Sequence, residues 1–168
     1  LSGSGKSTIA NAVAEKLREV DSRIITNLDG DIVRKNLSKG LGFDKESRST
    51  NVRRIGFVAY EIIKHGGTVF CANIAPYAED REANRRLIKA ARGKYLEVYV
   101  ATPAHVCAER DVKGLYAKAY RDEIKLTGVN DPFDIPQNPD VVVDHTMTIE
   151  EAAQKVMAMI SRVNFVCE

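Results

Sequence analysis

The first seven residues combine two glycines with a lysine and a serine at spacings that suit phosphate binding. The segment Leu1–Ser7 matches the end of the phosphate-loop pattern G-x-x-x-x-G-K-[ST], without its first glycine. Gly3 and Gly5 would let backbone N–H groups close around phosphate oxygens at the start of the helix that follows. Lys6 would reach the β- and γ-phosphates, and the Ser7 hydroxyl would bind Mg²⁺. The alternative is a glycine-rich turn that happens to precede a helix.

A phosphate loop predicts a bound nucleotide but not a reaction, because GTPases, ATPases and small-molecule kinases all use it. No Asn-Lys-x-Asp signature for guanine follows in the sequence, which argues against a GTPase. The length of 168 residues and a long lid-like segment, residues 110–137, favour a compact kinase. The sequence therefore predicts ATP binding.

Two carboxylates follow an apolar run that reads as a strand, residues 23–28. Asp29 and Asp31 flank Gly30 directly after this run. In a parallel sheet the end of that strand lies on the same rim as the phosphate loop. Such a pair could hold waters of Mg²⁺ and take a proton from an acceptor hydroxyl. An Asp-Gly turn in which Asp31 caps a helix is the structural alternative, and both interpretations can hold together.

Helical and strand patterns alternate along the chain, which predicts an α/β fold with a parallel sheet covered by helices on both faces. Apolar spacing predicts helices over residues 6–20, 50–65 and 79–91, and strands over 23–28, 68–74, 95–101 and 141–143.

Other local signals mark helix starts and loops. Thr102-Pro103 is typical of a helix cap followed by proline at the first helical position. Thr148 and Glu151 form a capping box that opens the last helix. Residues 35–47 and 110–137 fit neither period, so we expect them to form a substrate flap and a lid.

Composition gives no support to several other classes of protein. The length suggests one domain. The formal net charge is only +2, without long blocks of one sign, so neither nucleic acid nor a membrane surface is an expected partner. No apolar run approaches the ~18 residues of a membrane span. Cys71, Cys107 and Cys167 lack a Cys-x-x-Cys pair and read as reduced thiols of a cytoplasmic protein. The histidines lack zinc-ligand spacing.

Further segments, in order and over essentially the whole chain, resemble the adenylylsulfate (APS) kinase family. The matching segments are Leu28–Arg34, Leu41–Phe43, Arg48–Gly56, Ile74–Tyr77, Asp80-Arg81, Arg110–Tyr116, Ile124-Lys125, Thr127-Gly128, Asp131-Pro132 and Asn138–Asp140. The resemblance implies a P-loop kinase fold. It also implies transfer of the γ-phosphate of MgATP to the 3′-hydroxyl of APS, which gives PAPS.

The resemblance assigns roles on the ATP side of the site. ATP would be bound by Ser2, Gly3, Ser4, Gly5, Lys6, Ser7, Thr8 and Arg110, and Mg²⁺ by Ser7 and Asp29. The catalytic residues would be Lys6, Asp29, Asp31 and Lys113. Asp31 is our choice for the base, and Lys113 on the lid would stabilise charge on the transferring phosphate. A basic lid that serves only solubility is the alternative.

The resemblance also indicates which residues would bind the acceptor, APS. APS would be bound by Asp31, Arg34, Phe43, Arg48, Asn51, Ile74, Ala75, Lys113 and Leu115. Arg34 and Arg48 offer planar forks for anionic oxygens. Asn51 offers a hydrogen bond to a neutral polar group, and Phe43 a face for adenine. Without the resemblance, Arg48, Arg53 and Arg54 would read as a solvated helix face, and Phe43 as core or flap packing.

The chain departs from the family pattern at two places. Ala75 stands where members often carry a serine that can be phosphorylated, so an obligatory phosphoserine relay is excluded and direct in-line transfer is left. The lid reads Ile124–Gly128, one residue shorter than Ile-Lys-x-Phe-Thr-Gly, with Leu126 near the place of the phenylalanine. Stacking on the APS purine from that side would weaken to apolar contact, and Phe133 is too displaced to replace it.

The resemblance places a strand upstream of Leu1 in the middle of the sheet, so we expect residues 1–168 to be an N-terminally incomplete domain. The family also occurs fused to ATP sulfurylase, and a homo-oligomer is expected. The alternative function is an inactive regulatory domain that binds PAPS within an ATP sulfurylase, although the intact motifs at 5–7 and 29–31 favour an enzyme. A kinase for another small metabolite would leave every acceptor-side match unexplained.

Overall fold

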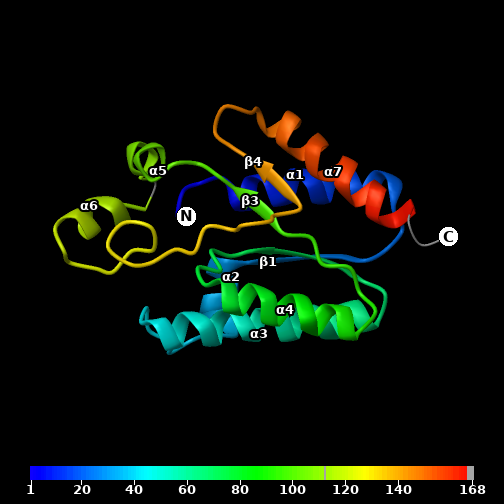
Figure 1. Cartoon of the computed structure of the whole chain (residues 1–168), viewed down its shortest axis with the longest axis horizontal. Helices are drawn as coiled ribbons and strands as arrows, with labels where there is room; N and C mark the ends of the chain where they lie inside the picture. The colour runs from blue at the N-terminus through cyan, green and yellow to red at the C-terminus, as the bar shows by residue number, and fades with distance from the viewer. Residues whose placement is uncertain (112, 166–168) are drawn as a thin grey trace.

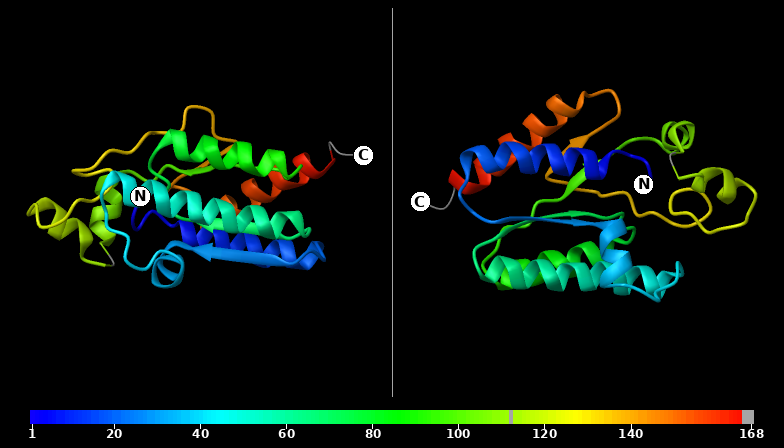
Figure 2. Two further views of the ribbon diagram at one scale, coloured as in Figure 1. Left: turned by 90° about the horizontal axis from the view of Figure 1, so that it is seen from below. Right: turned by 180° about the vertical axis from the view of Figure 1, so that it is seen from behind.

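The computed structural model describes residues 1–111 and 113–165, in which helices and strands alternate as expected. In chain order the elements are α1 (Lys6–Val20), β1 (Ile25–Asp29), α2 (Gly30–Asn36), α3 (Lys45–Lys64), β2 (Thr68–Ala72), α4 (Ala78–Ala90), β3 (Val98–Val100), α5 (Ala104–Arg110), α6 (Leu115–Tyr120), β4 (Val141–Val143) and α7 (Ile149–Phe165). The strands lie between α1 and α7 on one side and α3 and α4 on the other (Figure 1, Figure 2). The predicted α/β architecture with helices on both faces is therefore confirmed.

The strands pair in parallel, as predicted. β1 pairs with β2 in a register that sets Asp29 opposite Ala72, and β3 pairs with β4 in a register that sets Val100 opposite Val143. Within the described residues these are two separate two-stranded sheets. The parallel pairing brings the C-terminal ends of β1 and β2 to one rim, where the acidic pair lies.

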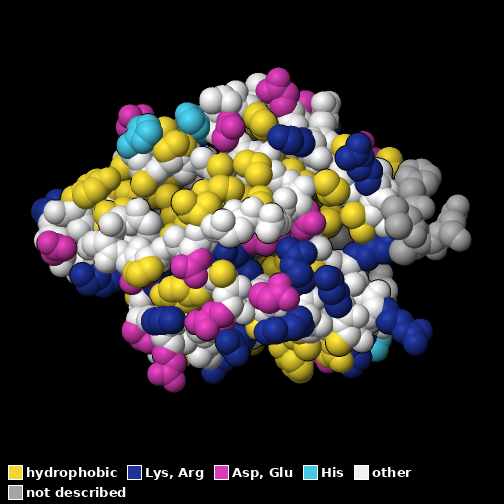
Figure 3. Space-filling view, in the orientation of Figure 1, with side chains coloured by type: hydrophobic (Ala, Val, Ile, Leu, Met, Phe, Trp, Pro, Cys, Tyr) yellow, Lys and Arg dark blue, Asp and Glu magenta, His cyan; other side chains and the backbone are white. Residues whose placement is uncertain are grey.

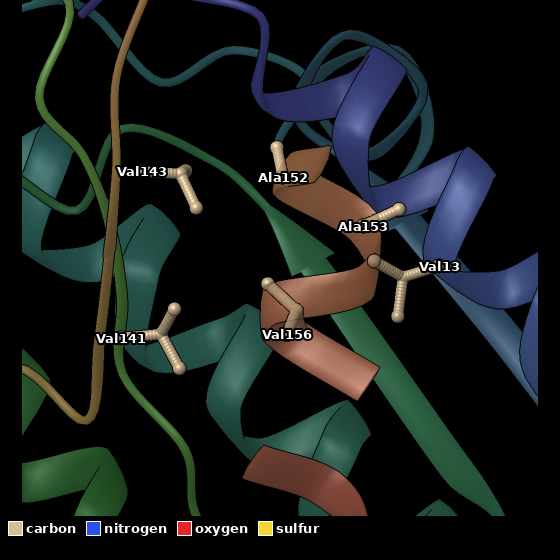
Figure 4. Close-up of a cluster of buried hydrophobic side chains, with 6 residues drawn as sticks. All are labelled: Val13, Val141, Val143, Ala152, Ala153 and Val156. Atoms are coloured by element: carbon tan, nitrogen blue, oxygen red, sulfur yellow. The ribbon is translucent and has the colours of Figure 1, made fainter. Parts of the chain in front are cut away.

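The largest buried apolar cluster joins α1, β4 and α7. It consists of Val13, Val141, Val143, Ala152, Ala153 and Val156 (Figure 4). Val141 and Val143 are buried while Val142 between them is 40% exposed, which is the alternation of a strand with one covered face. The cluster fixes α1, and with it the phosphate loop, against the sheet.

An apolar cavity of about 700 Å³ separates the two strand pairs. Residues of β2 and β3 line it, together with apolar side chains of α1, α3 and α7. The strand that we expect before Leu1, at the centre of the sheet, would occupy this place. The presence of this strand stays a prediction.

The cavity makes the prediction of a central strand testable. We expect an N-terminal extension of five β-branched residues and a glycine to pair with β2 and β3 and to stabilise the fold. Each valine that fills the cavity should add roughly 1.5 kcal/mol or more to the free energy of unfolding, measured by urea denaturation. An extension of the same length in glycine and serine is the control. Equal stability of the two extended chains would contradict the prediction.

Several helix starts differ from the sequence-based expectation, for local reasons. α3 begins at Lys45 rather than near residue 50, because the Asp44 carboxylate accepts hydrogen bonds from the Ser47 N–H at 2.9 Å and the Ser47 hydroxyl at 2.7 Å. α2 lies in part within the expected flap, and α6 within the expected lid. The capping box is confirmed, since the Glu151 N–H donates to Thr148 Oγ1 at 3.2 Å.

Two predicted helix caps are wrong. α2 is capped by Asp29 and not by Asp31, because the Asp29 carboxylate accepts from the Asp31 N–H at 2.9 Å. α5 begins at Ala104 with Pro103 at the cap position. Thr102 instead turns its hydroxyl toward the phosphate loop.

The surface agrees with the nearly neutral composition. Acidic and basic side chains are interspersed over the half of the molecule that holds α3 and α4 (Figure 3). Across residues 1–111 and 113–165, none of the helices combines the length and the apolar character that a membrane crossing requires. Cys71 lines the cavity and Cys107 is fully buried, both as free thiols, whereas Cys167 lies outside the described residues.

Candidate functional site

The phosphate loop turns sharply into the N-terminus of α1. Gly3 and Gly5 have φ angles of +70° and +101°, a left-handed conformation that favours glycine. Gly5 occupies the cap position of α1 and offers no side chain to the first N–H groups of the helix. These N–H groups and the positive end of the helix dipole are thus available to an anion.

Three polar side chains from later in the chain hold the carbonyl groups of the loop. Tyr116 Oη donates to the Ser2 carbonyl at 2.8 Å, Arg110 Nη1 to the Gly3 carbonyl at 3.2 Å, and Thr102 Oγ1 to the Ser4 carbonyl at 2.9 Å. Arg110 therefore lies at the phosphate loop, as the ATP-side assignment requires. Sequence reasoning missed the other two side chains, because nothing local to Thr102 or Tyr116 marks a partner about 100 residues away.

Lys6 bends back over the loop. Its ammonium group donates to the Leu1 carbonyl and lies 3.5 Å from Ser4 Oγ. Burial is the main cause of a lowered pKa at Lys6. Ser4 is itself buried, whereas Ser7 and Thr8 in the first turn of α1 are exposed. The lysine is thus a desolvated cation at the phosphate loop, where phosphate oxygens would be suitable partners.

Asp29 and Ser7 come together as predicted. Asp29 Oδ2 accepts from the Ser7 hydroxyl at 2.5 Å. This hydrogen bond is the largest cause of a pKa of Asp29 below its usual range, so the carboxylate stays ionised. A hydroxyl and a carboxylate side by side next to a phosphate site are hard oxygen ligands that fit Mg²⁺. No group of three or more His, Cys, Asp or Glu residues within the described parts of the chain could hold a metal alone.

Asp31 and Lys113 also come together. The Lys113 ammonium forms an ion pair with Asp31 Oδ2, which joins the lid to the acidic pair. Both side chains remain accessible, at 52% and 68% exposure respectively, so an incoming substrate can reach either group. The ion pair therefore sets a carboxylate and an ammonium group side by side at the rim of the sheet.

Arg34 and Phe43 form one unit in the flap. The Arg34 guanidinium carbon lies 4.3 Å from the centre of the Phe43 ring, and Nη1 donates to the carbonyls of Leu41 and Gly42 at 3.1 and 3.0 Å. The Phe43 ring is 60% exposed, so packing in the core does not explain it. An exposed ring backed by a guanidinium is suited to stack on a purine.

Arg48 and Asn51 are buried, so the interpretation of Arg48 as part of a solvated helix face is wrong. Arg48 donates to the carbonyls of Phe43 at 2.7 Å and Lys125 at 3.1 Å, and its Nε lies 3.1 Å from Asp131 Oδ2. It ties the flap to the lid segment, and much of its hydrogen-bonding capacity is already used. Asn51 Oδ1 is buried and has no hydrogen-bond partner among the described residues, which leaves an acceptor for a ligand.

The segment after β2 lies beside the acidic pair. A Cβ atom built on Gly30 would lie 3.6 Å from the Ala72 carbonyl oxygen, so the two chain segments nearly touch. Ile74 and Ala75 follow at this rim, and Ala75 has a left-handed φ of +45°. An alanine in this conformation is strained, which marks the segment as one held by its surroundings.

Leu115 and Leu126 lie differently from the expectation. Leu126 is only 6% exposed and belongs to a buried lid cluster with Cys107, Tyr116 and Ala119, against which Leu115 packs. In this structure the Leu126 side chain is therefore buried away from any surface that a purine could contact. Phe133 stacks on Tyr99 at 6.3 Å between ring centres and does not replace the missing aromatic residue.

Comparison with known proteins adds independent findings. The family model described as adenylylsulphate kinase matches residues 1–144. A probable adenylyl-sulfate kinase of Synechocystis sp. is 54% identical over 142 residues, which are 84% of this chain and 77% of the relative. The adenylyl-sulfate kinase of Picosynechococcus sp. is 45% identical over 168 residues, which are 99% of this chain and 92% of the relative.

A solved structure of similar shape is the Mycobacterium tuberculosis APS kinase CysC in complex with AMPPNP and APS. It matches with a TM-score of 0.91 and 40% identity, and the match covers 96% of this chain and 93% of that one. A hexameric APS kinase of Thiobacillus denitrificans matches with a TM-score of 0.73 and 39% identity over 96% of this chain and 27% of that one. These likenesses confirm the predicted P-loop kinase fold.

Proposed function

Because the chain belongs to the adenylylsulphate kinase family, we infer that it transfers the γ-phosphate of ATP to the 3′-hydroxyl of APS, giving PAPS and ADP. One structural observation supports this inference independently of family membership. The phosphate loop, the Ser7–Asp29 pair and the Asp31–Lys113 pair lie together at one rim of the sheet. A phosphate donor and a hydroxyl acceptor could be held there close to each other.

We propose the following roles for these residues. The loop N–H groups and Lys6 bind the phosphates of ATP and offset negative charge on the phosphoryl group as it moves. Ser7 and Asp29 would hold Mg²⁺, which would neutralise part of the negative charge of the phosphates. Asp31 accepts the proton of the 3′-hydroxyl. Lys113 brings a positive charge of the lid to the same place, where it stabilises negative charge on the transferring phosphate.

The acceptor side would be formed by the flap and the segment after β2. Phe43, backed by Arg34, offers its face to adenine, and Asn51 Oδ1 accepts a hydrogen bond from the ligand. Arg48 mainly positions the Phe43 backbone and the lid. Ile74, Ala75 and Leu115 would border the bound APS.

The test of this function is formation of PAPS and ADP from ATP and APS, followed by chromatography. An inactive regulatory domain would bind PAPS in a calorimetric titration without forming it from ATP and APS. Turnover of another metabolite in preference to APS would favour a different small-molecule kinase.

We expect catalysis without a phosphoenzyme, because Ala75 has no hydroxyl. Changing Ala75→Ser should leave kcat within about tenfold, or roughly 1.4 kcal/mol of barrier, because in-line transfer requires only that donor and acceptor be held close. The measurement is PAPS formation by both chains. In parallel, the unaltered enzyme is incubated with γ-labelled ATP in the absence of APS. Label that stays on the protein and then chases into PAPS at the catalytic rate would contradict direct transfer.

Assembly and location are further proposals. A homo-oligomer is proposed because a solved relative is described as hexameric. Fusion to an ATP sulfurylase is the other arrangement, since a probable bifunctional SAT/APS kinase of Sorangium cellulosum is 46% identical over 99% of this chain and 28% of its own length. The need for ATP and the reduced cysteines favour a cytoplasmic location.

A further inference from the structure

We propose that Arg81 is a positioning residue that holds the segment Ile74–Tyr77 in the shape that binds APS. The proposal rests on the proposed function, because it concerns the acceptor side of that site. Arg81 lies in α4, behind this segment, and is only 9% exposed. No role could be assigned to Arg81 from the sequence, although the pair Asp80-Arg81 is one of the segments that resemble the family.

The guanidinium of Arg81 contacts two chain segments at once. Nη1 donates to the carbonyls of Ala75 at 2.8 Å and Pro76 at 3.2 Å. Nη2 donates to the carbonyl of Asp134 at 2.7 Å, near the end of the lid segment. A planar guanidinium with several fixed donors can make these contacts together, whereas an ammonium group cannot reproduce their geometry.

Backbone contacts between the same two segments complete the arrangement. The Asp134 N–H donates to the Pro76 carbonyl at 2.9 Å, and the Ala78 N–H donates to Asp134 Oδ2 at 2.9 Å. Arg81 therefore lies at a junction of the acceptor segment with the chain that returns from the lid.

The contacts at this junction can hold Ala75 in its strained backbone conformation. The φ of +45° at Ala75 is unfavourable for a residue with a side chain and persists only where surrounding contacts fix it. The hydrogen bond from Arg81 to the Ala75 carbonyl is one such contact. Without it, the segment is expected to relax away from the shape that borders APS.

A neighbouring arginine provides a matched control. Arg81 Nε lies 2.7 Å from Glu97 Oε1, and Arg85 Nη2 lies 3.1 Å from Glu97 Oε2, so both arginines share one carboxylate and one helix. The polar contacts of Arg85 in the described structure run to Glu82, Glu97 and Asp140, and none of these three residues belongs to the acceptor segment. Replacement of Arg85 therefore disturbs the ion cluster and spares the junction.

The experiment compares Arg81→Gln with Arg85→Gln in steady-state kinetics with APS and ATP varied in turn. Loss of charge-assisted hydrogen bonds to the acceptor segment should raise KM for APS by about tenfold or more in Arg81→Gln, with KM for ATP changed less than about threefold. Arg85→Gln should leave both KM values near those of the unaltered chain. Arg81→Lys keeps the charge beside Glu97 and should recover only part of the APS affinity.

Hydrogen exchange provides a readout that needs no activity. The amides of Ala78 and Asp134 should exchange faster in Arg81→Gln than in Arg85→Gln. Equal exchange in the two variants, or KM values for ATP and APS that rise together, would overturn the positioning role. If the unaltered chain does not phosphorylate APS, the proposed function fails, and the exchange comparison still decides whether Arg81 holds this segment.

Discussion

Lys6→Ala is expected to abolish measurable PAPS formation. The Lys6 ammonium is desolvated and lies at the phosphate loop, where it donates to the Leu1 carbonyl and lies 3.5 Å from Ser4 Oγ. A preorganised positive charge at the transferring phosphate is worth several kcal/mol of barrier, so kcat should fall on the order of 10²–10³-fold or more. The assay is ATP-dependent PAPS formation at saturating substrates.

A lysine on the same helix serves as the control for Lys6→Ala. Lys16 lies in α1 and forms a surface ion pair with Glu150 at 2.7 Å, away from the phosphate loop. Lys16→Ala should keep normal turnover, because an exposed pair of this kind contributes little to stability. Thermal unfolding of the Lys6→Ala chain checks that it remains folded. Near-normal turnover in folded Lys6→Ala would refute the phosphate-loop assignment.

The parts of the structure that sequence could predict are governed by local patterns. α1 begins and ends at the predicted residues, since its apolar spacing is regular and Gly5 precedes it. β4 and the capping box at Thr148 also match, because each depends on neighbouring residues. The association of Ser7 with Asp29 followed from the rule that parallel strands and the phosphate loop share one rim.

The parts that sequence could not predict depend on contacts between distant segments. Arg48 resembles a surface arginine in its helix, yet the flap and lid close over it and accept its hydrogen bonds. Thr102 matches the pattern of a helix cap, but its hydroxyl bonds to the Ser4 carbonyl instead. Asp29 and not Asp31 caps α2 because the helix already begins at Gly30, directly after β1, so that Asp31 lies within its first turn.

Asp31→Asn is expected to remove most activity while ATP binding persists. The Asp31 carboxylate is 68% exposed at the rim and does not cap α2, since that helix is capped by Asp29 through the backbone N–H of residue 31. The asparagine retains this N–H and almost the same shape, so the fold should be preserved. Loss of a general base should lower kcat by about 10²–10⁴-fold. The measurements are kcat for PAPS formation and ATP affinity by calorimetry.

Two further variants separate the roles around Asp31. Asp29→Asn removes a carboxylate that contacts Ser7 and caps α2, so it should weaken MgATP binding as well as kcat. Lys113→Met removes the partner of Asp31 and leaves the carboxylate in place. Because proton transfer to Asp31 is expected to be the larger contribution, the kcat of Lys113→Met should fall less than that of Asp31→Asn.

Normal kcat in Asp31→Asn would show that the base is wrongly assigned. Asp29, the other carboxylate that flanks Gly30, would then become the candidate base.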